Sequence, residues 1–434
     1  MRKIRFIKIN SEIFAHSLNF NYFCQLKHKK KQDNIFIEMK DVMTQTKRFF
    51  MRPFFRDPRT LLGLWLLLGL IATLMKIHRC NNFLIFKYVF WHTWNQTSLY
   101  APYPYFYFDT NHYGPFFSLV IAPFAVLPHP LGLMFWLVLM SLALYYAVRK
   151  LPMPQGKQIF IYWFCAHELL TALFMSQFNI IIAAIIVASF YCIEKEKDAT
   201  AAFFIMVGTF VKLYGIVGLA FFFFSRHKLR FVLALVGWAA LFFVLPMAIS
   251  SPEYIIGQYQ EWYASLTAKN MENMFSNMQN QSLLGLVRKI SHVSTYSDLW
   301  LIVPGILAFC YPYLRISQYR HLAFRYAFLA SVLLFVVLFS TGSESSTYII
   351  ALLGVAIWYV TAPWKRNRWD VALMVFAFIL TSMSPSDLFP AYIRKTYVQP
   401  YALKALPCVL VWFKLVYEMA VRDYAPREIE AREA

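Results

Sequence analysis

Apolar stretches close to the length of a membrane-spanning helix recur along most of this chain, with short polar or basic turns between them. A helix that crosses a bilayer needs about 20 predominantly apolar residues. The clearest stretches are 60–77, 131–148, 158–175, 178–194, 229–249, 299–314, 323–340, 347–362, 370–384 and 400–420.

So many apolar stretches leave too little polar sequence for a water-soluble fold. The chain is 59% hydrophobic and 15% charged, whereas a soluble domain is about 45–50% apolar and about 25% charged. These values argue against a soluble enzyme, a secreted disulfide scaffold and a disordered protein. The sequence therefore predicts an all-α, polytopic integral membrane protein with about 10–13 transmembrane helices.

Two further stretches do not read as ordinary spans. Residues 115–127 are short and contain Pro115 and Pro123, and residues 199–224 carry Lys212 near their middle. Short or interrupted helices at membrane depth are often re-entrant and line a cavity. We expect these two stretches to lie beside a functional site.

The distribution of basic residues orients the chain. Turns at 225–230, 315–325 and 364–368 are rich in Lys and Arg, and cytoplasmic loops carry an excess of these residues. The loops at 78–113 and 250–298 then lie outside, and loops of this length are usually functional. The predicted organisation is a basic, partly disordered cytoplasmic tail, a multi-span membrane domain and a cytoplasmic C-terminal tail, at 1–59, 60–421 and 422–434. We expect a multi-pass protein of the bacterial inner (plasma) membrane.

Several familiar motifs do not occur. The sequence contains no phosphate-binding GxxxxGK[ST], no GxGxxG, no HExxH and no CxxC. We therefore predict no metal, no cofactor and no structural disulfide. The basic run at 27–31 suits anionic lipid headgroups as well as nucleic acid, and we expect no nucleic-acid partner.

The first outer loop offers a candidate general base. Asp109 is the only acidic residue of 78–113, and aromatic residues and His112 flank it. A carboxylate in such surroundings can remove a proton from a hydroxyl group; the alternative is a turn-capping aspartate. Residues 81–94, with Trp91 and Trp94, are typical of a helix that lies in the membrane interface.

Buried or interfacial cations are the candidates for binding an anionic group. A charge inside an apolar run is costly and is usually functional or paired, so we assign Lys212 to a phosphate of the substrate. Arg394 and Lys404 could serve in the same way. For all three, the alternative is a long side chain that reaches the headgroups.

Amide and carboxylate side chains complete the candidate site. Gln177 and Asn179 can hydrogen-bond sugar hydroxyls, with helix capping or interhelical bonding as the alternative. Glu344 is a second candidate base or a sugar ligand, with N-capping as the alternative. His167 and Glu168 favour structural pairing over catalysis. The Asn- and Gln-rich stretch 272–288 fits a polar lid or a solvated loop.

The order of several short motifs resembles glycosyltransferase family 87, the polyprenyl-phosphate-sugar-dependent α-mannosyltransferases of the C-type superfamily. The resemblance covers roughly residues 60–420. Its motifs are Leu99-Tyr100, the Ala-Pro-x-Ala-x-Leu-Pro segment 122–128, Gln177-Phe178-Asn179, Lys212-Leu213-Tyr214, and Asn280-Gln281-Ser282-Leu283 followed by Gly285 and Arg288.

The resemblance implies a C-type glycosyltransferase architecture and a specific chemistry. A hexose, such as mannose, passes from a polyprenyl phosphate to a lipid or glycan acceptor on the extracytoplasmic face, with inversion and with a carboxylate of the first outer loop as base. The expected catalytic residues are Asp109 and Glu344. The expected substrate-binding residues are Asn81, Asn82, His112, Tyr113, Gln177, Asn179, Lys212, Tyr214, Asn280, Gln281, Arg394 and Lys404.

One position departs from the family pattern. An Asp usually follows the first span, but here Asn81 and Asn82 stand in its place, and an amide cannot act as a base. Either Asp109 has taken over, or the base lies elsewhere, or the activity is altered or absent. The other hypotheses are a lipid-linked saccharide flippase or transporter, a polysaccharide ligase and a catalytically inactive family member. A flippase would carry charges along several spans, and a ligase would cluster Arg in an outer loop.

Overall fold

The computed structural model describes residues 52–276, 279–293 and 295–425. Most of the predicted N-terminal tail (1–51) and the end of the C-terminal tail (426–434) lie outside the described residues. The chain divides into two compact units, 1–61 and 62–434. The first contains α2 (Pro53–Arg56) and the start of α3 (Pro58–Lys76), and all later elements belong to the second.

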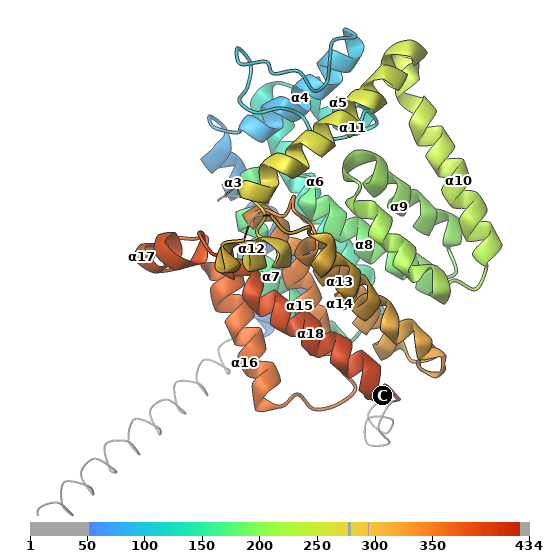
Figure 1. Ribbon diagram of the computed structural model, residues 1–434, viewed down its shortest axis with the longest axis vertical. Coiled ribbons are helices and arrows are strands. Elements are labelled where there is room, and N and C mark those ends of the chain that lie inside the picture. Colours follow the sequence, from blue (N-terminus) through green and yellow to red (C-terminus); the bar gives the residue numbers. More distant parts are fainter. Residues whose placement is uncertain (1–51, 277–278, 294, 426–434) are drawn as a thin grey trace, which may run out of the picture. The chain divides into compact units, whose positions relative to one another are not determined.

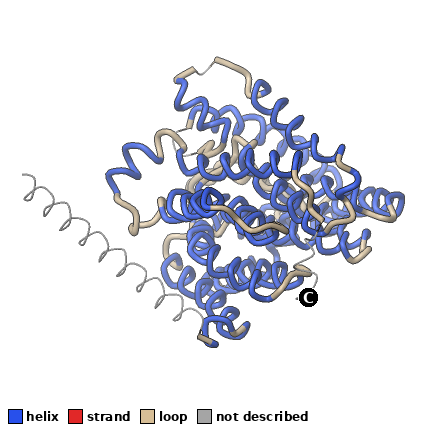
Figure 2. Tube along the Cα trace, turned by 90° about the horizontal axis from the view of Figure 1, so that it is seen from below, coloured by secondary structure: helices blue, strands red, loops and turns tan. Residues whose placement is uncertain are grey.

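The all-α prediction is confirmed, since the described residues contain no strand (Figure 2). The remaining α-helices are α4 (Asn81–Trp94), α5 (Phe117–Ala125), α6 (His129–Lys150), α7 (Gln155–Met175), α8 (Asn179–Glu194), α9 (Asp198–Lys212), α10 (Lys228–Val244), α11 (Pro252–Phe275), α12 (Leu283–Ser291), α13 (Leu299–Cys310), α14 (Leu322–Leu338), α15 (Tyr348–Thr361), α16 (Arg368–Phe376), α17 (Ala391–Ile393) and α18 (Leu406–Val421). Short 3₁₀ segments are η1 (Tyr214–Phe224), η2 (Leu245–Ile249), η3 (Tyr311–Leu314), η4 (Ile316–Gln318), η5 (Ser345–Thr347) and η8 (Leu403–Ala405), and π-helical segments are η6 (Ala377–Met383) and η7 (Arg394–Val398).

The chain is an integral membrane protein. Among the described residues, four helices are long and apolar enough to cross a bilayer, namely Pro58–Lys76, His129–Lys150, Gln155–Met175 and Lys228–Ile249. Shorter apolar helices of 10–17 residues accompany them. The α10 helix exposes Leu229, Leu233 and Val236, as expected of a surface that faces lipid. The number of passes stays a prediction.

The α15 helix lies at the centre of the second unit. Every residue from Tyr348 to Trp358 is buried, and α14, α7, α8 and α18 pack around it. A helix that is apolar on all sides belongs in such an interior position. Its N-terminal end, preceded by η5, therefore has a fixed place to which other segments can be anchored.

The stretch 199–224 folds as two segments, α9 and η1, and is therefore interrupted next to Lys212. The chain reverses at Leu213, whose φ is 53°, and η1 runs back along α9. A Cβ on Gly215 would lie 2.5 Å from the Gly208 backbone, so the two segments touch where glycine permits it. Ser225 Oγ donates to Asp198 Oδ1 at 2.5 Å and closes the far end. Lys212 consequently stands at the tip of a helical hairpin.

The two stretches predicted as outer loops contain more helix than the sequence indicated. The interfacial helix predicted at 81–94 has those bounds as α4, and α5 (117–125) is a short helix that packs on α4 and α6. The stretch 250–298 contains α11 and α12. The polar stretch 272–288, expected to be a lid or a loop, includes the end of α11 and the start of α12, with residues 276–282 between the two helices. In Figure 1, α11 crosses the end of the unit at which α4 and α5 also lie.

Candidate functional site

A cavity of about 330 Å³ lies among α4, the loop before α5, the tip of the α9–η1 hairpin, α11 and the turn before η5. Eight of the predicted site residues line it: Asn82, Asp109, His112, Tyr113, Gln177, Lys212, Tyr214 and Glu344. These residues come from five separate parts of the sequence. A cavity with several convergent polar groups is the usual form of a small-molecule site.

Asn81 holds the backbone that precedes Asp109. Its Nδ2 donates to Phe108 O at 2.6 Å, and Phe108 N–H donates to its Oδ1 at 2.7 Å. Asp109 itself has a φ of 69°, a left-handed conformation that costs a residue with a Cβ some energy and is often maintained at functional sites. The Asn81 side chain is thus occupied by backbone and does not line the cavity.

The segment that follows Asp109 is docked on two helices. Gly114 N–H donates to Val211 O at 3.0 Å, and Trp262 Nε1 donates to His112 O at 2.9 Å. A Cβ on Gly114 would lie 2.2 Å from Phe210 O, so only glycine allows this approach. The loop therefore brings Asp109 and His112 to the cavity in a defined position.

Asp109, His112 and Lys269 form a cluster of titratable side chains at the cavity. Asp109 Oδ1 lies 3.9 Å from His112 Nε2 and 3.8 Å from Lys269 Nζ. His112 Nδ1 contacts Ser265 Oγ at 3.1 Å, while its buried Nε2 has no hydrogen-bond partner among the described residues. Burial, and to a smaller extent the Lys269 ammonium, lowers the pKa of His112 to about 4, so the imidazole is neutral at pH 7.

Lys212 is held by an amide and two aromatic rings. Its Nζ donates to Asn179 Oδ1 at 2.6 Å and lies 5.7 Å from the ring centre of Tyr113 and 5.1 Å from that of Tyr214. Tyr214 Oη is in turn 2.7 Å from Ser340 Oγ. Aromatic faces attract a cation, so the ammonium is fixed in position at the cavity.

The turn that starts η5 is bound to the segment before α8 by a network of side chains. Gln177 Nε2 donates to Glu344 Oε2 at 2.9 Å, and Ser346 Oγ donates to Gln177 Oε1 at 2.9 Å. Asn179 Nδ2 donates to Gln177 Oε1 at 2.8 Å and also lies 3.2 Å from Ser346 Oγ. Glu344 N–H donates to Thr347 Oγ1 at 3.1 Å. Asn179 supports the cavity from behind, whereas Gln177 and Glu344 line it.

Four other predicted substrate ligands do not line this cavity. Asn280 is fully buried and its Oδ1 accepts from Ser282 Oγ at 2.7 Å, while Gln281 N–H donates to Ser343 O at 2.7 Å and braces the turn before η5. Arg394 donates to the backbone oxygens of Pro385 and Ser386. Lys404 is only 3% exposed and is paired with Glu168. Gln281, Arg394 and Lys404 instead line a separate pocket of about 60 Å³.

Three polar cavity residues were missed because α11 was read as a loop. Lys269, Asn270 and Asn273 line the cavity from α11. Residues four apart lie on one face of a helix, so this spacing would have been informative once the helix was recognised. Asn273 Oδ1 is buried and has no hydrogen-bond partner within the described part of the chain, which is a polar atom available to a ligand.

Two grooves adjoin the cavity. One, of about 450 Å³, shares Asn270, Ser340 and Thr341 with it and is walled by the apolar side chains of Met274, Leu284, Leu299, Ile302 and Phe339. The other, of about 600 Å³, shares Thr110, His112 and Lys269 and is polar, with Ser98, Tyr100, Glu261, Ser265 and Glu272. Across the described residues, no three His, Cys, Asp or Glu side chains are placed to hold a metal ion.

Comparison with known families gives one match. The model of glycosyltransferase family 87 matches residues 111–341, which is more than half of the chain, and confirms the resemblance noted from the motifs. The matched region includes Gln177, Asn179 and Lys212, while Asp109 and Glu344 lie just outside it. No curated protein gives a significant match.

Proposed function

Because the chain belongs to glycosyltransferase family 87, we propose that it transfers a hexose from a polyprenyl phosphate sugar to a lipid or glycan acceptor. The reaction inverts the anomeric carbon and takes place on the extracytoplasmic face of a bacterial inner membrane. Mannose is the hexose that the family resemblance favours. The chain is a glycosyltransferase; the donor, the acceptor and the stereochemistry are the proposed part.

The observation that carries this proposal is that a carboxylate and a fixed ammonium line the same cavity. Asp109 and Lys212 both line it. Asp109 accepts the proton of the acceptor hydroxyl, whose oxygen attacks the anomeric carbon. The bond from that carbon to the phosphate oxygen breaks, and polyprenyl phosphate leaves with the electron pair. Lys212, fixed by Asn179, stabilises the negative charge that grows on the leaving phosphate.

Gln177 and Glu344 are the proposed ligands of the sugar hydroxyls. Their side chains are hydrogen-bonded to each other at 2.9 Å and line the cavity, so an amide and a carboxylate are presented together with known orientation. Sugar hydroxyls both donate and accept hydrogen bonds. Glu344 remains the second candidate base if Asp109 proves dispensable.

The two grooves differ in polarity, which supports one groove for the donor and the other for the acceptor. The isoprenoid chain of a polyprenyl phosphate has to stay in an apolar environment, which the groove beside Phe339 offers. An acceptor rich in hydroxyl groups fits the polar groove that reaches His112 and Lys269. The two grooves share different residues with the cavity, so each substrate can reach it through its own groove.

Transfer by the full chain, in membranes supplied with labelled polyprenyl phosphate hexoses and no nucleotide sugar, tests the proposal. Asp109→Asn should abolish transfer while the protein still folds, and Glu344→Gln should leave measurable transfer. Asp387→Asn is the matched control, because Asp387 is fully exposed and outside the cavity. Unimpaired transfer by Asp109→Asn would remove Asp109 as the base. Movement of the intact carrier lipid without transfer would support a flippase, and neither activity would support an inactive family member.

A further inference from the structure

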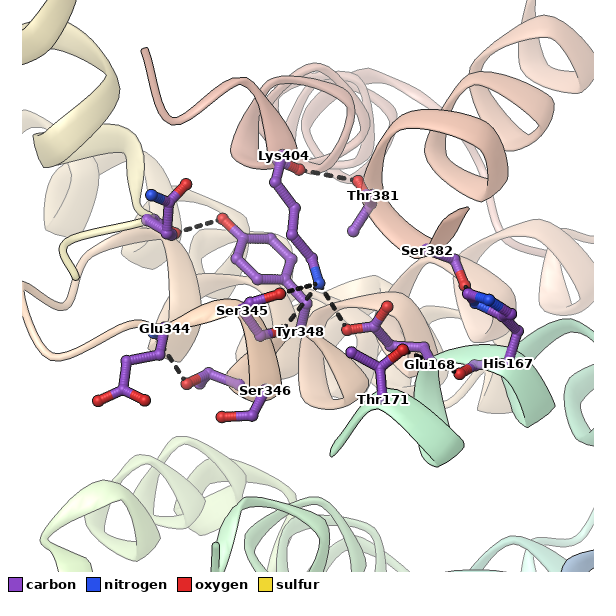
Figure 3. Close-up of polar contacts among 12 residues, drawn as sticks. His167, Glu168, Thr171, Glu344, Ser345, Ser346, Tyr348, Thr381, Ser382 and Lys404 are labelled. Atoms are coloured by element: carbon purple, nitrogen blue, oxygen red, sulfur yellow. Dashed lines mark hydrogen bonds and ion pairs between the residues drawn. The ribbon is translucent and has the colours of Figure 1, made fainter. Parts of the chain in front are cut away.

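A buried ion pair lies immediately behind the turn that carries Glu344. Lys404, just before α18, donates through Nζ to Glu168 Oε1 of α7 at 2.8 Å (Figure 3). Both side chains are almost completely buried, at 4% and 0% exposure. The two residues are 236 positions apart in the sequence, so the pair joins α7 to the segment that leads into α18.

The same ammonium also holds Ser345. Lys404 Nζ donates to Ser345 O at 2.8 Å and to Ser345 Oγ at 3.0 Å. A lysine ammonium has three N–H donors, and Glu168 with the two oxygens of Ser345 accounts for all of them. Lys404 therefore has no donor left for a substrate phosphate in this arrangement, which differs from the role expected from the sequence.

Ser345 separates this ion pair from the cavity. In Figure 3, the Glu344 carboxylate points away from Lys404; it lines the cavity and accepts from Gln177. The next residue, Ser346, donates to Gln177 Oε1. One short turn is thus bound on its far side by Lys404 and on its near side by Gln177 and Asn179, and Asn179 also holds Lys212.

We propose that Lys404 and Glu168 position the Glu344–Thr347 turn, and through it set the orientation of Glu344 and Gln177 at the cavity. The inference rests on the proposed glycosyl transfer for its effect on rate. Lys404 is a positioning residue and Glu168 is its counter-charge, which allows the ammonium to remain buried. Release of Ser345 would let the turn move, and a misplacement of about 1 Å at a reacting centre can cost about 10²-fold in rate.

Lys404→Met in the full-length protein is the first test. We expect kcat per folded molecule to fall about 10²-fold. The KM for the acceptor should stay within about twofold, because the polar groove does not include the turn. The variant leaves Glu168 buried and unpaired, which strongly destabilises a protein. Lys404→Met combined with Glu168→Gln removes both charges and should restore folding but not kcat.

Thr381→Val is the matched control in the same neighbourhood. Thr381 Oγ1 donates to the backbone oxygen of Lys404 at 2.9 Å and does not touch Ser345. It should alter stability slightly and leave kcat unchanged. If the charge-neutral double variant folds and retains full kcat, Lys404 is structural only. If the kcat of the double variant falls no more than that of Thr381→Val, the conclusion is the same.

Two further measurements separate positioning from general damage. In the Glu344→Gln background, Lys404→Met should add little to the loss of kcat, since both changes act on one turn; additive losses would contradict the coupling. Hydrogen exchange of backbone amides in 343–348 should be faster in the double variant than in Thr381→Val. This readout needs no transferase activity, so unchanged exchange would overturn the inference even if the proposed reaction were wrong.

Discussion

The clamp that Asn81 forms on the backbone of Phe108 gives a sharp prediction about where the catalytic base stands. Asn81→Asp keeps the oxygen that accepts from Phe108 N–H, but it replaces the Nδ2 donor, 2.6 Å from Phe108 O, by a carboxylate oxygen. Two oxygens then face each other. The net value of a protein hydrogen bond is about 0.5–1.5 kcal/mol, so the clamp weakens by about 1 kcal/mol.

A loss of this size, expressed in the transition state, lowers the rate about fivefold, since 1.36 kcal/mol is tenfold. Movement of Asp109 by about 1 Å would extend the loss towards 10²-fold. We therefore expect kcat of Asn81→Asp to fall between about fivefold and 10²-fold, with little change in thermal stability because Asn81 is partly exposed. The assay supplies labelled polyprenyl phosphate hexose and obtains kcat from the amount of labelled product.

The decisive experiment places a carboxylate at position 81 while removing the one at 109. In Asn81→Asp with Asp109→Asn, transfer should remain absent, because the side chain at 81 contacts the Phe108 backbone and does not line the cavity. Asn82→Asp with Asp109→Asn is the matched comparison, since Asn82 does line the cavity. Recovery of transfer in the double variant with Asn81→Asp would refute the reasoning that Asp109 has replaced the base expected after the first span.

Three other predictions follow from the cavity. Lys212→Met should lower kcat about 10²–10³-fold, the usual cost of removing a preorganised charge-stabilising donor, and transfer within threefold of wild type would contradict the phosphate role. The pKa of His112 falls from 6.5 in the unfolded chain to about 4 in the folded protein, so the unfolded state takes up the proton first and stability falls, by about 3 kcal/mol in all, as the pH drops from about 6.5 to about 4. His112→Gln should show a weaker fall of apparent Tm over that range, and an identical pH profile would contradict the assignment. Gly114→Ala should reduce both Tm and transfer because its Cβ would collide with Phe210 O, whereas Gly257→Ala, with nothing within 4 Å of the new Cβ, should be neutral or stabilising by about 0.5–1 kcal/mol.

Most helices were predictable because hydrophobic segments of sufficient length have few other solutions in a bilayer. The α4 helix has the bounds 81–94 expected from its apolar spacing. The reversal at Leu213 was not predictable: no proline or glycine occupies that position, and the close contact of Gly208 with Gly215 depends on how η1 folds back. The helical nature of 252–275 was also hidden, since its surface is polar and its periodicity is weak.

Residue types at the site were easier to predict than their partners. Asp109, Lys212, Gln177 and Glu344 were singled out because polar groups are rare in this chain, and the structure brings them to one cavity. Their positions in the sequence gave no indication that they lie close together in space. The partner of Lys404 could not be predicted, because its counter-charge lies 236 residues earlier in a different helix, and nothing in the local sequence identifies it.

The two buried lysines, Lys212 and Lys404, differ in how their charges are balanced. A buried ammonium is costly unless an opposite charge accompanies it. Lys404 has the carboxylate of Glu168 at 2.8 Å, so its charge is balanced within the protein. For Lys212, no carboxylate of the described residues lies within 4.0 Å, and its contacts are the Asn179 oxygen and two aromatic rings. Its charge is oriented but incompletely balanced, and it borders a cavity. An anionic group that enters the cavity would complete this site, whereas it would find nothing to bind at Lys404.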